Sequence, residues 1–150
     1  MIGKFSRLTA MGLLTLLMSA CSGERPGNLG VREGLLAACP SSPNCVSSQA
    51  GDEGHRITPL SFDDDPDIAF ARLAKVLKSR PDAAFIEATD RYLRVELRTN
   101  FFVDDAEFLM DRERRVIQIR SASRLGYSDF GKNRQRMEEI RAQFGKPDAR

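Results

Sequence analysis

Two stretches of the chain carry apolar residues at the spacing of a helix. The first follows Asp65-Pro66, and an Asp followed by Pro suits the cap and first turn of a helix. This helix should end before Pro81, because the residue before a proline avoids the helical region. The second helix begins near Ser128 or Asp129. Its apolar stripe would consist of Phe130, Met137, Ile140 and Phe144.

Between and before these helices, apolar and polar residues alternate, which predicts half-buried strands. The strands are expected over residues 56–62, 83–89, 93–97, 106–110 and 117–119. The order of strand, helix, antiparallel strands and helix indicates an α+β fold. We expect a single antiparallel sheet of about four to five strands with both helices packed on one face. The other face would then be open to solvent, a ligand or a partner.

Two turns set the register of the outer face. A polar turn over residues 112–115 places Glu107 directly opposite Arg120. A similar turn over residues 100–105 would place Arg98 beside Glu107. Opposite charges across neighbouring strands stabilise a sheet, so a row of Arg98, Glu107 and Arg120 is predicted on this face.

The start of the chain has the pattern of an export signal. Two basic residues precede a short apolar run over residues 8–18, which is too short to cross a bilayer. The segment from Leu17 to Cys21 resembles the bacterial lipobox, although Met18 stands where that motif normally has Leu. The resemblance implies cleavage after residue 20 and a lipid on Cys21. Ordinary signal cleavage, which would leave Cys21 a free thiol, is the alternative.

The chain therefore divides into four parts. Residues 1–20 form the signal peptide, and the Gly-rich residues 21–34 form a flexible tether. Residues 35–146 form one α+β domain, whose first part, to residue 54, should contain little regular structure. Residues 147–150 form a C-terminal tail.

Charge narrows the range of partners. Without residues 1–20 the chain has 21 Lys and Arg against 21 Asp and Glu, which argues against nucleic acid as a partner. The same balance argues against an electrostatic membrane patch, so lipid alone would hold the protein at the membrane. Ser22 stands where Asp resembles an inner-membrane retention signal, which favours the outer membrane. We expect an anchored protein that faces the periplasm, and no cofactor is predicted.

Export also bears on Cys39 and Cys45, because disulfides form and persist outside the cytosol. A structural disulfide between them is the leading interpretation. A metal site with His55 and either Asp52 or Glu53, a redox pair and free thiols are alternatives. The spacing matches neither a known zinc pattern nor Cys-x-x-Cys.

Four motifs occur in order along the chain. They are Cys39-Pro-Ser-Ser-Pro-Asn-Cys-Val-Ser-Ser48, then Arg98-Thr99 with Asp104-Asp105 and Glu107-Phe108, then Arg120-Ser-Ala-Ser-Arg124 with Gly126, and Asp129-Phe-Gly-Lys-Asn-Arg134. Together they resemble the bacterial and plastid family catalogued as domain of unknown function 1499, over about residues 30–145. The resemblance implies the boundaries of the fold and an exported setting, and it implies no reaction.

Three groups of residues are candidates for chemistry. Carboxylates at Asp104, Asp105 and Glu107 suit acid–base catalysis or a hard cation, or else a solvated turn and a salt bridge. A helix start near Asp129 suits an anion, or else its amides are capped by Ser128 or Asp129 itself. The anion site would consist of Arg120, Ser121, Ser123, Arg124, Asp129, Asn133 and Arg134.

The third group is a Ser–His–Asp arrangement built on the single histidine, His55, with Ser47 or Ser48 and Asp52. The chain has no Gly-x-Ser-x-Gly elbow, so we expect His55 to be a surface residue.

The leading expectation is a non-catalytic envelope lipoprotein that binds a small anionic ligand or an envelope protein. The binding face would carry Arg98, Glu107, Arg120, Arg124 and Arg134. An envelope enzyme that uses Asp104, Asp105 or Glu107, with or without a metal, is the alternative. A purely structural or assembly role is the third possibility.

Overall fold

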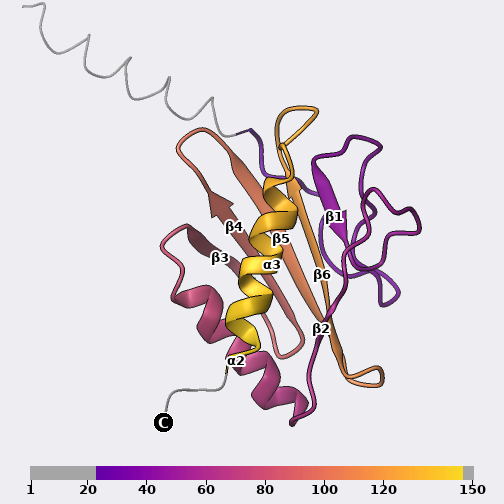
Figure 1. Ribbon diagram of the computed structural model, residues 1–150, viewed down its shortest axis with the longest axis vertical. Helices are drawn as coiled ribbons and strands as arrows, with labels where there is room; N and C mark the ends of the chain where they lie inside the picture. Colours follow the sequence, from indigo (N-terminus) through magenta and orange to yellow (C-terminus); the bar gives the residue numbers. More distant parts are fainter. Residues whose placement is uncertain (1–22, 147–150) are drawn as a thin grey trace, which may run out of the picture.

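A computed structural model describes residues 23–146, in which two helices lie on one side of an antiparallel sheet (Figure 1). The elements in chain order are β1 (Cys45–Ser47), β2 (Leu60–Ser61), α2 (Pro66–Lys78), β3 (Ala83–Ala88), β4 (Tyr92–Arg98), β5 (Val103–Asp111), β6 (Val116–Ser123) and α3 (Lys132–Phe144). The predicted α+β class and the placement of both helices on one face are confirmed. The predicted signal peptide, Cys21 and the C-terminal tail lie outside the described residues.

The sheet has six strands rather than the four to five expected. The order is β1-β6-β5-β4-β3, and β2 pairs with β6 beside β1. β1 lies in the segment where little regular structure was expected. Its three residues pair with β6 opposite Arg120 to Ala122, and Val46 enters the core. A run this short shows no alternation that sequence alone could detect.

The β5–β6 hairpin has the predicted register, with Glu107 opposite Arg120. The predicted register of β4 and β5 was wrong. The turn is shorter, because the Thr99 amide donates to the Phe102 carbonyl and closes the hairpin over four residues. Arg94 therefore lies opposite Glu107, and Arg98 pairs with Val103.

The observed register of β4 and β5 places two candidate residues in a strand instead of a turn. Asp104 and Asp105 were expected in a solvated turn, but they are buried residues of β5 that point to opposite faces of the sheet. Asp104 faces the helices, and Asp105 lies on the other face.

The core lies between the helices and the sheet. Asp65 caps α2 as predicted, and its side chain accepts from the amides of Asp67 and Ile68. α3 begins at Lys132, later than predicted, because residues 128–130 form a capping loop before it. Phe130 was expected in the apolar stripe of α3 but is 98% exposed. The stripe that packs into the core consists of Met137, Ile140 and Phe144.

The face of the sheet away from the helices is covered by the start of the described chain. Arg25 donates to Glu96, and the Gly30 amide donates to Glu107. Arg120, from β6, donates to the carbonyl of Ala38. Residues 23–34, which composition predicted as part of a flexible tether, are thus held against the sheet by bonds that span more than 70 positions of sequence. Over β4, β5 and β6 most of this face is therefore buried.

Candidate functional site

Charged side chains from three strands meet beneath the N-terminal segment. Alternation along β4 and β5 brings them to one face of the sheet, and we call this set the covered network. Its members are Arg25, Arg94, Glu96, Asp105, Glu107, Arg120 and Arg124. The guanidinium of Arg124 is central, because it lies 2.7 Å from Asp105 and 2.5 Å from Glu96.

The carboxylates of this network are fully engaged. Glu107 is buried and accepts from the Tyr92 hydroxyl and the Gly30 amide, both at 2.8 Å, and from Arg120 at 3.4 Å. Burial would raise the pKa of Glu96, but hydrogen bonds from Arg124, Arg25 and Arg98 outweigh it and lower the pKa to about 2. A carboxylate with so low a pKa is a poor proton acceptor near neutral pH.

A second buried ion pair lies on the helix side of the sheet. Arg136 of α3 is almost fully buried, and its guanidinium lies 2.5 Å from one carboxylate oxygen of Asp104. The same guanidinium reaches Asp82 at 3.5 Å. Within the described part of the chain, Oδ1 of Asp104 has no hydrogen-bond partner.

The start of α3 is fixed by a hydrogen-bonded cluster centred on Asn133. Its side chain lies within hydrogen-bonding distance of Ser121, Ser123, Asp129 and the carbonyl of Asn44. Asp129 also accepts from the backbone amides of Asn133 and Gly131. The side chain of Asp129 therefore occupies the amides that an anion would need, which is the capping arrangement that the sequence offered as the alternative.

A cavity of about 200 Å³ opens between the β4–β5 loop and the β6–α3 loop. Its lining is mainly apolar, with side chains such as Phe102, Leu125 and Phe130. Asp104 and Asp129 are among the polar residues that line it. An apolar wall with a few fixed polar groups is the usual form of a small-molecule site, although this cavity is smaller than most.

The cysteines and the histidine lie apart from this cavity. Cys39 and Cys45 form the predicted disulfide. The ring of His55 lies 2.8 Å from Asp52 and 3.0 Å from the carbonyl of Ser42, and these two hydrogen bonds raise its pKa. Among residues 23–146, no three His, Cys, Asp or Glu side chains come together as metal ligands.

The hydroxyls considered as nucleophiles are engaged elsewhere. Ser47 accepts from the Gln49 amide, and Ser48 donates to Gln118. In the described part of the structure neither hydroxyl is bonded to the ring of His55, although the Ser47 amide donates to the His55 carbonyl. In that same part, neither helix is long and apolar enough to cross a membrane.

The family model described as Protein of unknown function (DUF1499) matches residues 35–144. The chain belongs to this family. No curated protein and no solved structure matches the chain. In this DUF1499 protein, three of the four motifs that carried the resemblance meet in the cluster at the start of α3, which contains Asn44, Ser121, Ser123, Asp129 and Asn133.

The candidate residues do not form one binding face in this DUF1499 protein. Glu107, Arg120 and Arg124 belong to the covered network. Arg98 is half exposed and joins the edge of this network through Glu96, whereas Arg134 lies in another region and donates to the carbonyls of Gly54 and Arg56. The predicted face of five residues is therefore not present as an open surface.

Sequence reasoning missed five charged residues of these sites, namely Arg25, Asp82, Arg94, Glu96 and Arg136. The alternation of β4 carried a signal for Arg94 and Glu96. Arg136 shares the helical spacing of Asn133, Met137 and Ile140, so its position on the buried side of α3 was also visible in the sequence.

Proposed function

We propose that this DUF1499 protein is an exported bacterial lipoprotein, anchored in the envelope through Cys21, whose domain binds a small ligand without catalysis. The export signal and the lipobox-like segment before Cys21 support the anchoring. The disulfide between Cys39 and Cys45 supports an oxidising compartment such as the periplasm.

The carboxylates favour binding over catalysis. Glu107, Asp105 and Asp104 each pair with a buried arginine. A general base must be free to take a proton from substrate, whereas each of these carboxylates is already ion-paired with a guanidinium group. The enzyme alternative would need the arginines to move away.

The cavity beside α3 is the proposed ligand site, and one observation carries this choice. Asp104 lines the cavity and has a buried oxygen without a hydrogen-bond partner in the described residues. Buried polar atoms are normally satisfied, so a group that donates a hydrogen bond to Asp104 would be stabilised there. The ligand that fits is small and mainly apolar with a donor or cationic group. It differs from the anion expected from sequence, because the side chain of Asp129 lies against the helix amides.

Native mass spectrometry of the mature protein, extracted from bacterial membranes in detergent, tests this proposal. We expect the native spectrum to show a mass above that of the lipidated protein, and we expect this extra mass to be lost on denaturation. The variant Phe102→Ala removes part of the cavity wall, and since Phe102 is half exposed the fold should tolerate the change. The Phe102→Ala variant should carry less of the bound ligand mass than the unaltered protein. The control is Ile68→Ala, at a distant exposed site, and it should carry the ligand mass unchanged. Absence of any extra mass in the unaltered protein would contradict ligand binding.

A further inference from the structure

Exposed apolar side chains gather at one end of the molecule. Eight large apolar residues of the described chain are exposed, and five of them lie in two loops. Residues of both loops line the same cavity, and both loops lie at the upper end of the molecule in Figure 1. We call this set the aromatic end, and its members are Phe101, Phe102, Leu125, Tyr127 and Phe130. Clustering of this kind marks an interaction surface, whereas scattered exposed residues need no explanation.

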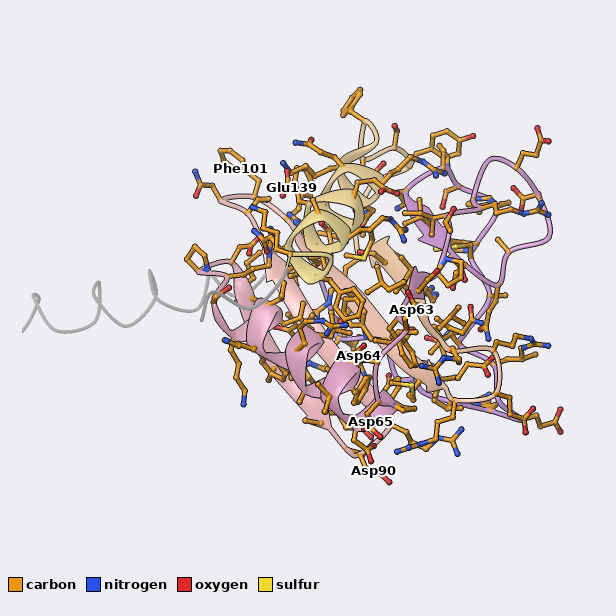
Figure 2. The ribbon with its side chains drawn as sticks, turned by 60° about the horizontal axis from the view of Figure 1, so that its bottom comes forward. Asp63, Asp64, Asp65, Asp90, Phe101 and Glu139 are labelled. Carbon is orange, nitrogen blue, oxygen red and sulfur yellow. A yellow bond between two sulfur atoms is a disulfide. The ribbon has the colours of Figure 1, made fainter. Side chains whose placement is uncertain are left out.

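The fold holds these side chains outward. Phe130 has a φ of 54°, a left-handed conformation that costs a non-glycine residue about 1 kcal/mol. The neighbouring hydrogen bonds, from the Phe130 amide to Ser128 and from the Gly131 amide to Asp129, fix this conformation. Phe101 extends away from the ribbon in Figure 2 and is 77% exposed.

The proposed lipid attachment lies beside the same end. Gly23 packs so closely that an added Cβ would lie 3.1 Å from both Leu125 Cγ and Arg124 Cβ. In Figure 1 the described chain begins between the two loops. Two residues of chain reach at most about 7 Å, so a lipid on Cys21 would enter a bilayer close to Leu125.

We infer that the aromatic end docks onto the surface of the phospholipid bilayer that holds the lipid anchor. This inference rests on the proposed lipid attachment at Cys21. Phe101, Tyr127 and Phe130 would enter the boundary between headgroups and acyl chains, where aromatic rings are favoured. The anchor keeps these loops at a high effective concentration beside the bilayer, so weak insertion is enough to orient the domain. α2 would then begin at the end that points away from the membrane, as its position in Figure 1 indicates.

The balance of charge supports a bilayer rather than an anionic partner. The chain after residue 20 has equal numbers of basic and acidic residues. Docking would therefore depend on apolar contact and proceed on zwitterionic lipid. It should also be insensitive to salt, because salt screens charge interactions only.

The chain has no tryptophan, so a single substitution creates a unique fluorescent reporter. We would reconstitute the mature lipoprotein carrying Phe101→Trp in phosphatidylcholine–phosphatidylethanolamine vesicles. Fluorescence would then be measured with brominated acyl chains and with aqueous acrylamide as quenchers. The matched control is Ile68→Trp, an exposed apolar residue in the first turn of α2, at the other end of the molecule. A second reporter, Phe130→Trp, shows whether the result at position 101 holds for the other loop of the aromatic end.

We expect the reporters at positions 101 and 130 to be quenched by brominated lipid. Quenching by acrylamide should be several-fold weaker at these positions than at position 68. Equal acrylamide quenching at both ends would overturn the docking. Protection from acrylamide without quenching by lipid would also overturn it, because a protein would then cover the aromatic end.

The intact mass of the same sample separates the two proposals. If the protein carries the lipid but its aromatic end stays in water, the docking is contradicted and the proposed lipid anchor is not. A protein without lipid on Cys21 would contradict the anchor and the docking that rests on it.

Discussion

At the scale of single residues, buried charges are the feature on which stability depends most sharply. Glu107 has no exposed surface and accepts from Arg120, Tyr92 and Gly30. Removing one partner of a buried pair leaves the other charge uncompensated, which costs far more than the loss of a surface ion pair. The covered network should therefore tolerate little change.

The variant Glu107→Gln should lower the free energy of unfolding by about 3 kcal/mol, because Arg120 stays buried without its counter-charge. Urea unfolding with the disulfide intact would measure the difference. Glu113→Gln, in the exposed turn between β5 and β6, is the control and should change stability by less than about 0.5 kcal/mol. Similar losses in both variants would show that Glu107 is not held as described.

The depressed pKa of Glu96 predicts how stability depends on pH. Its pKa in the folded protein is about 2, against 4.5 for the unperturbed group. The stabilisation is therefore complete above pH 4.5 and is lost as the pH falls towards 2, and it amounts to about 3 kcal/mol. Glu96→Gln should be less stable near neutral pH and should show a flatter decline between pH 4.5 and 2. An unchanged decline would contradict the role of Glu96, and Glu113→Gln should keep the original profile.

Sequence reasoning found part of this network for a physical reason. Alternation and the short β5–β6 turn were enough to pair Glu107 with Arg120. Adjacent acidic residues are disfavoured in strands, so Asp104-Asp105 indicated a turn. Their burial in β5 depends on Arg136 and Arg124, which lie 32 and 19 positions away in the sequence, and such partners are not visible in a local pattern.

At the scale of elements, the segment over residues 23–38 is the main departure from expectation. Its glycines and charges have the composition of a linker. Its order comes from bonds to strands far along the chain, including Arg25 to Glu96 and Gly30 to Glu107. The helices and central strands were predictable because their signals are periodic and local, whereas the packing of this segment is neither.

Gly23 tests the attachment of this segment. It has a φ of 72°, and an added Cβ would press on Arg124 and Leu125. Gly23→Ala should loosen the segment, so the Gly30 amide, which donates to Glu107, should exchange its hydrogen faster. Gly27→Ala is the matched control, because nothing lies within 4 Å of the added atom. Hydrogen exchange followed by NMR would compare the two variants, and equal exchange at Gly30 would contradict close packing at Gly23.

At the scale of the whole molecule, the N-terminal segment covers the sheet face away from the helices, and this changes where a ligand or partner can bind. The sequence predicted an open sheet face lined by arginines, but the N-terminal segment closes it. The cavity and the exposed aromatic side chains both lie instead at the end between the β4–β5 and β6–α3 loops. The described chain begins at this same end (Figure 1). The packing of residues 23–38, which no local pattern reveals, thus brings the start of the described chain, which follows the proposed anchor, to the same end as the cavity and the apolar surface.

The lipid on Cys21 is the claim on which the proposed function and the docking both depend. Trypsin should release residues 21–32 as the first peptide of the mature protein, because Pro26 blocks cleavage after Arg25. Mass spectrometry of this peptide, from protein produced in an exporting bacterium, is the most direct measurement. We predict a peptide that begins at Cys21 and carries the added mass of a diacylglyceryl group. A peptide that retains residues before Cys21, or one that begins at an unmodified Cys21, would contradict the anchor.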